Sequence, residues 1–168
     1  MSASVILDHV EYYFGSDSKK VKSIILENIR EEIKKQAERD GLFPEDYAST
    51  LSFVCHNKAT GQVLTFSLGD SRIYRVRDGC AEYVNQTKPH DRNIVCSTVS
   101  FSAENEAVLK KTHAEPNEGF LLCTDGMWKN AEKAEFERSV FGIYGSASLA
   151  KQLEEQKISD DCSFLFVA

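Results

Sequence analysis

The chain has 168 residues, of which 42% are hydrophobic and 27% are charged, and its formal net charge at pH 7 is -6. These values are typical of a single globular domain and exclude an intrinsically disordered chain. The negative charge argues against nucleic-acid binding, because a nucleic-acid interface needs a basic patch.

No stretch of the sequence is long and apolar enough for a membrane span, which needs about 18 apolar residues. The N-terminus has no basic start and carries Asp8 and Glu11, so it does not resemble a signal peptide. The five cysteines form no Cys-x-x-Cys pair and most lie in apolar segments. We therefore expect free thiols in a reducing compartment and a cytoplasmic protein.

The N-terminal third is predicted to be helical. Residues 4–14 have apolar positions at helical spacing, and Gly15 ends that segment. Ser16 or Asp17 can cap a second helix, whose apolar stripe continues to about residue 39 before Asp40-Gly41. We expect this stripe to contact the core of the domain.

The pattern then changes to the alternation that is typical of strands. Strands are predicted at residues 50–56, 62–68, 72–77, 80–84, 94–101, 107–112 and 119–124. Helices are predicted at about residues 131–141 and 146–156, and the final residues SDDCSFLFVA predict a loop and a last buried strand. The whole chain, residues 1–168, is therefore interpreted as one α+β domain, an antiparallel sheet with helices packed on it.

Aspartates flank three of these predicted strands. Asp70 follows QVLTFSLG, Asp125 follows FLLCT, and Asp160 and Asp161 precede SFLFV. The pair Asp125-Gly126 is also what a simple turn would contain. If the strand ends meet at one rim, however, converging carboxylates need a cation between them, and Mg²⁺ or Mn²⁺ prefers such oxygen ligands.

The motifs GDSRIYRVRDG at 69–79, LLCTDGMW at 121–128 and DDCSFLFV at 160–167 resemble, in order and spacing, the C-terminal motifs of the metal-dependent type-2C serine/threonine protein phosphatases. STLSFV at 49–54 resembles the family strand that precedes Gly-Asp-Ser-Arg. The resemblance covers essentially the whole chain. It implies an antiparallel β-sandwich flanked by helices, in α-β-β-α layers, that lacks the family's first strands.

The resemblance also implies roles for the aspartates. Asp125 and Asp160 are expected to be catalytic ligands of a centre that holds two Mg²⁺ or Mn²⁺ ions, and Asp70 is expected to contribute to a weaker third metal site. Arg72 is expected to be structural. The implied reaction is direct hydrolysis of phosphoserine or phosphothreonine in a phosphoprotein by a metal-activated water.

The chain departs from the family pattern at two places. It contains no Asp-Gly-x-Gly-Gly, the motif that supplies the bridging metal ligand in the family, so tight binding of two ions is expected to be lost. Lys129 stands where the family often has an aspartate, and a lysine would repel a cation. The family's loop motif is also degraded around His90, which we expect to be polar surface.

Two interpretations of these departures remain open. The chain is either part of a phosphatase whose first strands lie elsewhere, or a catalytically inactive pseudophosphatase that acts as a binding or regulatory module. In both cases we expect weak or absent activity for the chain by itself. We also expect exposed strand edges that a regulatory protein partner or self-association would cover. A structural domain with chance motifs is the third possibility, and it would bind no metal through Asp125.

Overall fold

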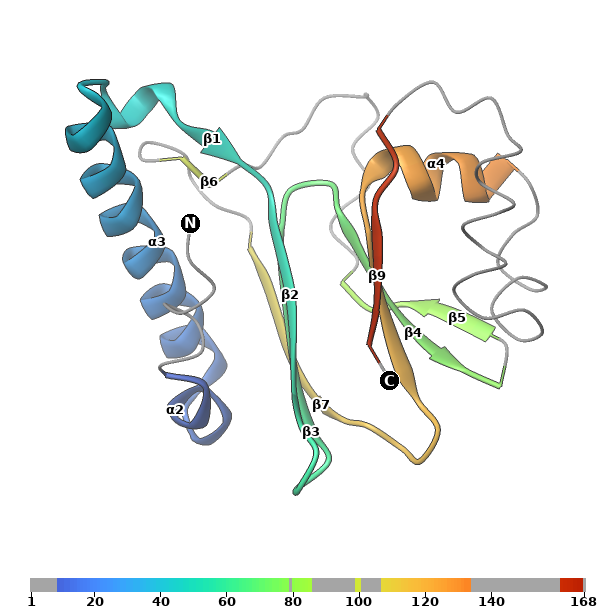
Figure 1. Cartoon of the computed structure of the whole chain (residues 1–168). Helices are drawn as coiled ribbons and strands as arrows, with labels where there is room; N and C mark the ends of the chain where they lie inside the picture. Colours follow the sequence, from blue (N-terminus) through green and yellow to red (C-terminus); the bar gives the residue numbers. More distant parts are fainter. Residues whose placement is uncertain (1–8, 79, 86–98, 101–106, 134–160, 168) are drawn as a thin grey trace.

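Two antiparallel sheets and the helices beside them make up the part of the chain that the computed structural model describes, residues 9–78, 80–85, 99–100, 107–133 and 161–167 (Figure 1). The helices are α2 (Val10–Gly15), α3 (Ser18–Asp40) and α4 (Asp125–Lys133), with a short 3-10 helix η1 (Pro44–Asp46). The strands are β1 (Ala48–Ser49), β2 (Leu51–Asn57), β3 (Gln62–Leu68), β4 (Arg72–Arg77), β5 (Cys80–Tyr83), β6 (Val99–Ser100), β7 (Val108–His113), β8 (Gly119–Cys123) and β9 (Phe164–Val167).

The longer strands form two sheets with the orders β2-β3-β7 and β5-β4-β8-β9, and β1 pairs with β6. Every pairing is antiparallel. The loop between β3 and β4 carries the chain from the first sheet to the second. The observed architecture is therefore the predicted α+β fold with antiparallel sheets.

Helix α3 begins and ends where the sequence predicts. The Asp17 carboxylate accepts hydrogen bonds from the backbone N–H groups of Lys19 and Lys20, at 2.9 and 3.3 Å, and so caps the helix N-terminus. Gly41 adopts the left-handed conformation that ends many helices. Within the described residues, no helix combines the length and the apolar character that crossing a membrane requires.

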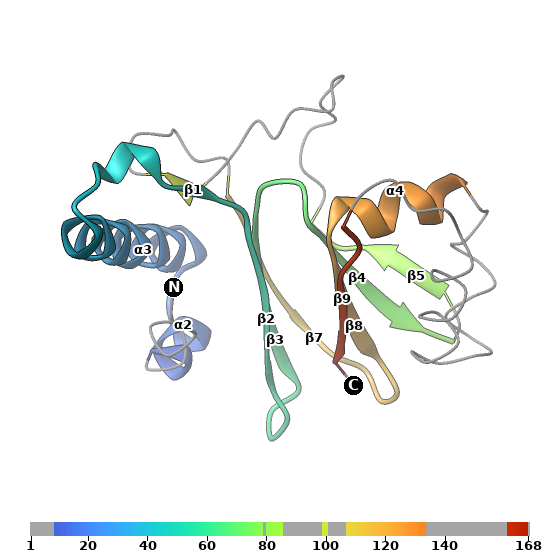
Figure 2. The same cartoon turned by 45° about the horizontal axis from the view of Figure 1, so that its top comes forward.

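The alternation of residues in the strands creates successive apolar layers. On β3, the side chains of Leu64, Phe66 and Leu68 pack against α2 and α3. On the other face of β3, Val63 packs against Ile73 and Phe120 of the second sheet. Figure 2 shows α3 and α4 on opposite sides of this pair of sheets.

The third apolar cluster lies on the outer face of the second sheet, under α4. It contains Tyr74, Val76, Leu121, Cys123 and Met127. The layers therefore follow the order helix, sheet, sheet, helix, as expected.

Several predicted elements differ from the structure or lie outside the described residues. Helix α4 begins at Asp125, earlier than the helix predicted at about residues 131–141, so Asp125-Gly126 lies in a helix and is not a simple turn. Residues 134–141 of the predicted helix lie outside the described residues. Met127 is 1% exposed, and its burial against the sheet stabilises a helix that starts directly after β8. The helix predicted at 4–14 is described as α2, Val10–Gly15. The strand predicted at 94–101 is described only at β6, Val99–Ser100. The helix predicted at 146–156 lies outside the described residues.

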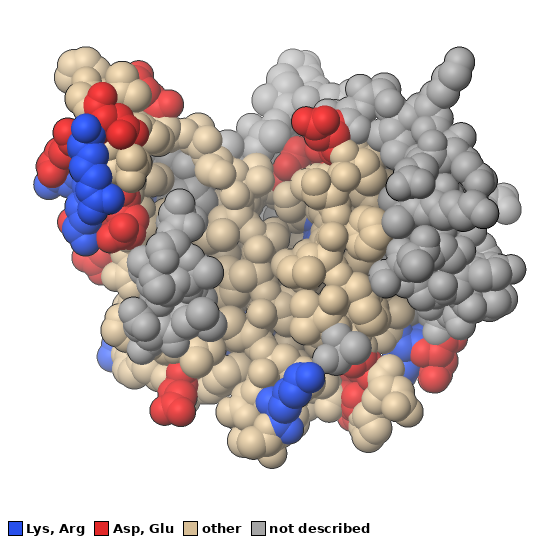
Figure 3. Space-filling view, viewed as in Figure 1, with Lys and Arg blue, Asp and Glu red and all other residues tan. Residues whose placement is uncertain are grey.

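Strands β2 and β9 are the outer strands of their sheets in the described part of the chain. Both face the viewer in Figure 1, and the surface over them in Figure 3 is almost free of charged atoms. Leu165 and Phe166 on β9 are 59% and 41% exposed. Among the described residues, no strand pairs with the outer edge of β2 or of β9.

Replacement of Phe66 by alanine is expected to reduce the free energy of unfolding by about 3–5 kcal/mol, because the change leaves a cavity in the core. Phe66 is fully buried and stacks on Phe53, with ring centroids 5.2 Å apart. Urea unfolding followed by circular dichroism measures the loss. Phe43→Ala is the matched control, because Phe43 is 75% exposed and should cost less than about 0.5 kcal/mol. Equal effects of the two substitutions would contradict the packing described here.

Candidate functional site

The candidate site begins at Thr124, the residue between β8 and α4. The Thr124 carbonyl accepts hydrogen bonds from the backbone N–H groups of Met127 and Trp128, at 3.1 and 3.2 Å, so the helix starts directly where the strand ends. This places Asp125 in the first turn of α4. The N-terminal end of a helix favours a negative charge, so an ionised Asp125 is stabilised at this position.

Thr124 also holds the segment that precedes β9. Its hydroxyl accepts a hydrogen bond from the Ser163 N–H at 3.0 Å and lies 3.3 Å from the Asp161 carbonyl, to which it can donate. The Thr124 N–H in turn donates to the Ser163 carbonyl at 3.0 Å. The backbone of Asp161 is therefore fixed beside the residue that precedes Asp125. Asp160 lies outside the described residues.

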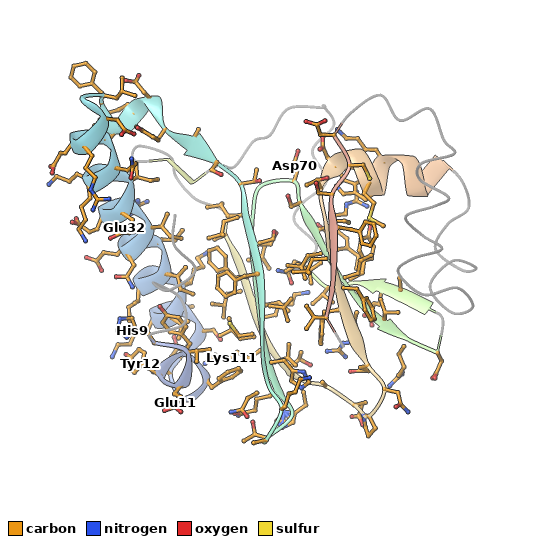
Figure 4. The ribbon with its side chains drawn as sticks, in the orientation of Figure 1. His9, Glu11, Tyr12, Glu32, Asp70 and Lys111 are labelled. Carbon is orange, nitrogen blue, oxygen red and sulfur yellow. The ribbon has the colours of Figure 1, made fainter. Side chains whose placement is uncertain are left out.

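The loop between β3 and β4 brings Asp70 to the same rim. Gly69 has a φ of +112°, and a Cβ atom there would lie 2.6 Å from the Thr50 Cβ, so glycine is required before Asp70. The indole Nε1–H of Trp128 donates to the Asp70 carbonyl at 2.9 Å. Figure 4 shows Asp70 at the upper rim beside the start of α4, and Figure 3 shows acidic atoms along this rim. Trp128 in α4 and Thr124 directly before it therefore hold the Asp70 loop and the Asp161 segment at the same end of the helix.

Both carboxylate oxygens of Asp125 already have partners. Oδ2 lies 2.8 Å from the Lys129 Nζ, and Oδ1 accepts the Gly126 N–H at 2.9 Å. The hydrogen bond from Lys129 lowers the pKa of Asp125 below its ordinary value, against the opposing effect of partial burial. The Asp125 and Lys129 side chains are 27% and 35% exposed, so solvent screens this ion pair.

Arg72 is held between two aromatic rings. Its guanidinium carbon lies 3.5 Å from the centroid of the Trp128 ring and 5.0 Å from that of Tyr83. It also donates a hydrogen bond to the Tyr74 hydroxyl at 3.1 Å. These contacts agree with the structural role expected for Arg72, because they fix Trp128 and through it the backbone of Asp70.

The donors at this rim suit a hard divalent ion, since Asp70, Asp125 and the Asp161 segment offer oxygen ligands. In the ranges that the structure describes, however, no three His, Cys, Asp or Glu side chains converge on a point that could hold a metal. An ion bound here through Asp125 would have to exchange with the Lys129 ammonium. The described residues alone therefore do not provide a complete set of metal ligands.

The three cysteines that the structure shows as free thiols are Cys55, Cys123 and Cys162, and all three have raised pKa values. Burial raises the pKa of Cys123 to about 12 and that of Cys55 to about 11, and burial also raises the pKa of Cys162. All three are free thiols, as the sequence predicts. A nucleophilic cysteine needs a thiolate, and the raised pKa values disfavour the thiolate form of these three residues.

The sequence predicts aspartates as site residues, but it does not predict the side chains that contact their segments. Thr124 and Trp128 were not predicted to contact Asp161 and Asp70, and no spacing in the sequence reveals contacts between residues so far apart. The pairing of Lys129 with Asp125 has a signal, because residues four positions apart on a helix face each other. The helix predicted from about residue 131 starts after both Asp125 and Lys129, so the prediction does not include this pair.

The family model "Protein phosphatase 2C" matches residues 3–158 of the chain. Among solved structures, PppA, a key regulatory component of T6SS in Pseudomonas aeruginosa, has a TM-score of 0.66 at 23% identity and covers 98% of this chain and 77% of its own. The Mycobacterium tuberculosis serine/threonine phosphatase PstP/Ppp has a TM-score of 0.69 at 18% identity, with 97% and 78% covered. The catalytic domain of PstP in complex with two manganese ions has a TM-score of 0.66 at 14% identity, with 98% and 78% covered. No curated protein sequence matches the chain.

Replacement of Lys129 by methionine is expected to raise the pKa of Asp125 toward the ordinary value for aspartate, about 3.9. The Lys129 hydrogen bond is the main cause of the lowered pKa, and the substitution removes it. The pKa of Asp125 is lower in the folded than in the unfolded protein, so the ion pair stabilises the fold at pH values above the pKa that Asp125 has in the unfolded chain. This stabilisation is lost as the pH falls through the pKa that Asp125 has in the folded protein. Titration of the Asp125 carboxyl carbon by NMR measures the change. An identical pKa in both proteins would show that Lys129 does not hold Asp125 in solution.

Proposed function

Because the chain belongs to the protein phosphatase 2C family, we propose that it hydrolyses phosphoserine and phosphothreonine in phosphoproteins at the rim formed by β8, α4 and the β3–β4 loop. The observation that supports this proposal is the junction at Thr124. There, Asp125 lies in the first turn of α4, while hydrogen bonds from Thr124 and Trp128 hold the Asp161 and Asp70 backbones nearby.

We propose Asp125, Asp160 and Asp70 as the residues that hold Mg²⁺ or Mn²⁺. The complex of PstP with two manganese ions supports the choice of metal. Bound ions of this kind supply a reactive water and neutralise charge on the phosphoryl group. The protein's own residues keep the carboxylates in place: Thr124 fixes the approach to β9, and Trp128 fixes the loop that carries Asp70.

A second function, as a binding or regulatory module without catalysis, is favoured by one observation. The Lys129 ammonium neutralises Asp125, so this carboxylate is satisfied without a metal ion. The 168 residues also contain no Asp-Gly-x-Gly-Gly. Under this alternative the rim is retained as a scaffold, and the surface of the domain recognises a partner protein.

We also propose that a second copy of the chain covers the exposed edges of β2 and β9. In the described part of the chain no strand pairs with the outer edge of β2 or of β9, and the backbone groups of such an edge can pair with another chain. The face that carries β2 and β9 has few charges to oppose this pairing (Figure 3).

Replacement of Asp125 by asparagine is expected to reduce Mn²⁺-dependent hydrolysis of p-nitrophenyl phosphate by at least about 100-fold, because even residues that only support metal ligands cost 10–100-fold. Release of p-nitrophenol, measured with and without Mn²⁺, gives the rate. Asp78→Asn is the matched control. It makes the same chemical change at a side chain that is 88% exposed, in a left-handed conformation that asparagine tolerates.

Metal-dependent turnover that Asp125→Asn abolishes and Asp78→Asn retains would support the phosphatase. A folded wild-type chain without turnover at any Mn²⁺ concentration would favour the non-catalytic module instead. Turnover that survives in Asp125→Asn would contradict the proposed site.

Replacement of Leu165 by lysine is expected to convert a self-associated chain into a monomer, since a charge on an edge strand opposes pairing. Leu165 is 59% exposed, so the substitution leaves the core intact. Light scattering coupled to size exclusion measures the mass of each protein. A wild-type chain that is monomeric at high concentration would contradict self-association through these edges.

A further inference from the structure

We infer that the Lys129 ammonium occupies the cation position at Asp125, so that a divalent ion binds this carboxylate only by displacing a positive charge that the chain itself supplies. The inference builds on the proposed role of Asp125 as a metal ligand. It assigns to Lys129 the role of a residue that sets the metal affinity of the site.

The contact between the two side chains is direct and local. The Lys129 Nζ lies 2.8 Å from the Asp125 Oδ2, which is the oxygen that does not accept the Gly126 N–H. The two residues are four positions apart on α4, with the acidic residue first, which is the favourable order for an ion pair on a helix. Both partners of the pair therefore lie on the same face of one helix.

The surroundings of Lys129 keep its charge near the rim. Its Nζ lies 5.5 Å from the centroid of the Trp128 ring, and the Arg72 guanidinium lies 3.5 Å from the same centroid. Trp128 also donates to the Asp70 carbonyl, which ties the ring to the loop that carries this proposed ligand. Lys129 thus contacts Asp125 directly, while Arg72 stacks on the tryptophan ring beside it.

Competition of this kind lowers the affinity for metal without removing the ligand. The pair is partly exposed, and exposed ion pairs are weak, so an ion can displace the ammonium. Repulsion between the ammonium and a divalent ion at about 5 Å in water nevertheless reduces binding by roughly tenfold. Removal of the ammonium should therefore tighten the binding of Mn²⁺ by about tenfold.

Titration of the 168-residue chain with Mn²⁺ alone, followed by fluorescence, tests the inference. Trp128 is the only tryptophan in the sequence, and a paramagnetic ion at Asp125 would quench it. Lys129→Met keeps the apolar stem and removes the charge, and Lys129→Gln is a second variant should the first fail to fold. Lys35→Met is the matched control, because Lys35 forms a similar helical ion pair with Glu32 at 2.9 Å on α3. Asp125→Asn in the Lys129→Met background identifies binding through the carboxylate.

The inference is supported if Lys129→Met binds Mn²⁺ about tenfold more tightly than wild type, the control binds like wild type, and the added Asp125→Asn removes the gain. Equal affinities of wild type and Lys129→Met, with binding abolished by Asp125→Asn, would overturn the inference and leave Asp125 as a metal ligand. If no protein quenches at millimolar Mn²⁺, both the inference and the proposed metal site are wrong. Fluorescence reports binding without turnover, so these outcomes do not depend on catalysis.

Discussion

The arrangement of the rim depends on Thr124 more than on any of the acidic residues. Its carbonyl accepts the first hydrogen bonds of α4, and its N–H and hydroxyl bond the backbone of Ser163, directly before β9. The hydroxyl also lies within hydrogen-bond distance of the Asp161 carbonyl. A residue with only an apolar side chain could keep the strand pairing but would lose the hydroxyl contacts. Asp125 follows Thr124 directly, so its position depends on the hydrogen bonds by which Thr124 joins β8, α4 and the start of β9.

Trp128 connects this junction to the β3–β4 loop, through which the chain passes from the first sheet to the second. Its indole donates to the Asp70 carbonyl, and the stacked Arg72 guanidinium fixes its plane. Asp70 is thus positioned through its backbone carbonyl. Gly69 is part of the same arrangement, since any Cβ atom there would collide with Thr50.

Much of this architecture could be predicted because local rules and the global fold agree. Helix α3 has a capping aspartate, an apolar stripe and a terminal glycine, and β3 alternates two buried faces, so the sequence alone determines both elements. The start of α4 could not be predicted from local rules. Asp-Gly usually indicates a turn, and here the burial of Met127 under the helix overrides that preference. The contacts of Thr124 with Ser163 and of Trp128 with Asp70 join distant parts of the sequence, and spacing carries no information about them.

The ion pair between Asp125 and Lys129 connects the two proposed functions of the domain. In a site that depends on metal, carboxylates without a cation repel each other and destabilise the fold, so the apo protein needs a substitute charge. Lys129 supplies that charge from the helix that carries Asp125. A lysine at position 129 therefore weakens the attraction for a metal ion and also stabilises the rim when no metal ion is bound. A family member with this lysine can keep the geometry of the rim whether or not it retains catalysis. The free energy with which a divalent ion competes against the Lys129 ammonium is therefore one of the factors that separate the two proposed functions.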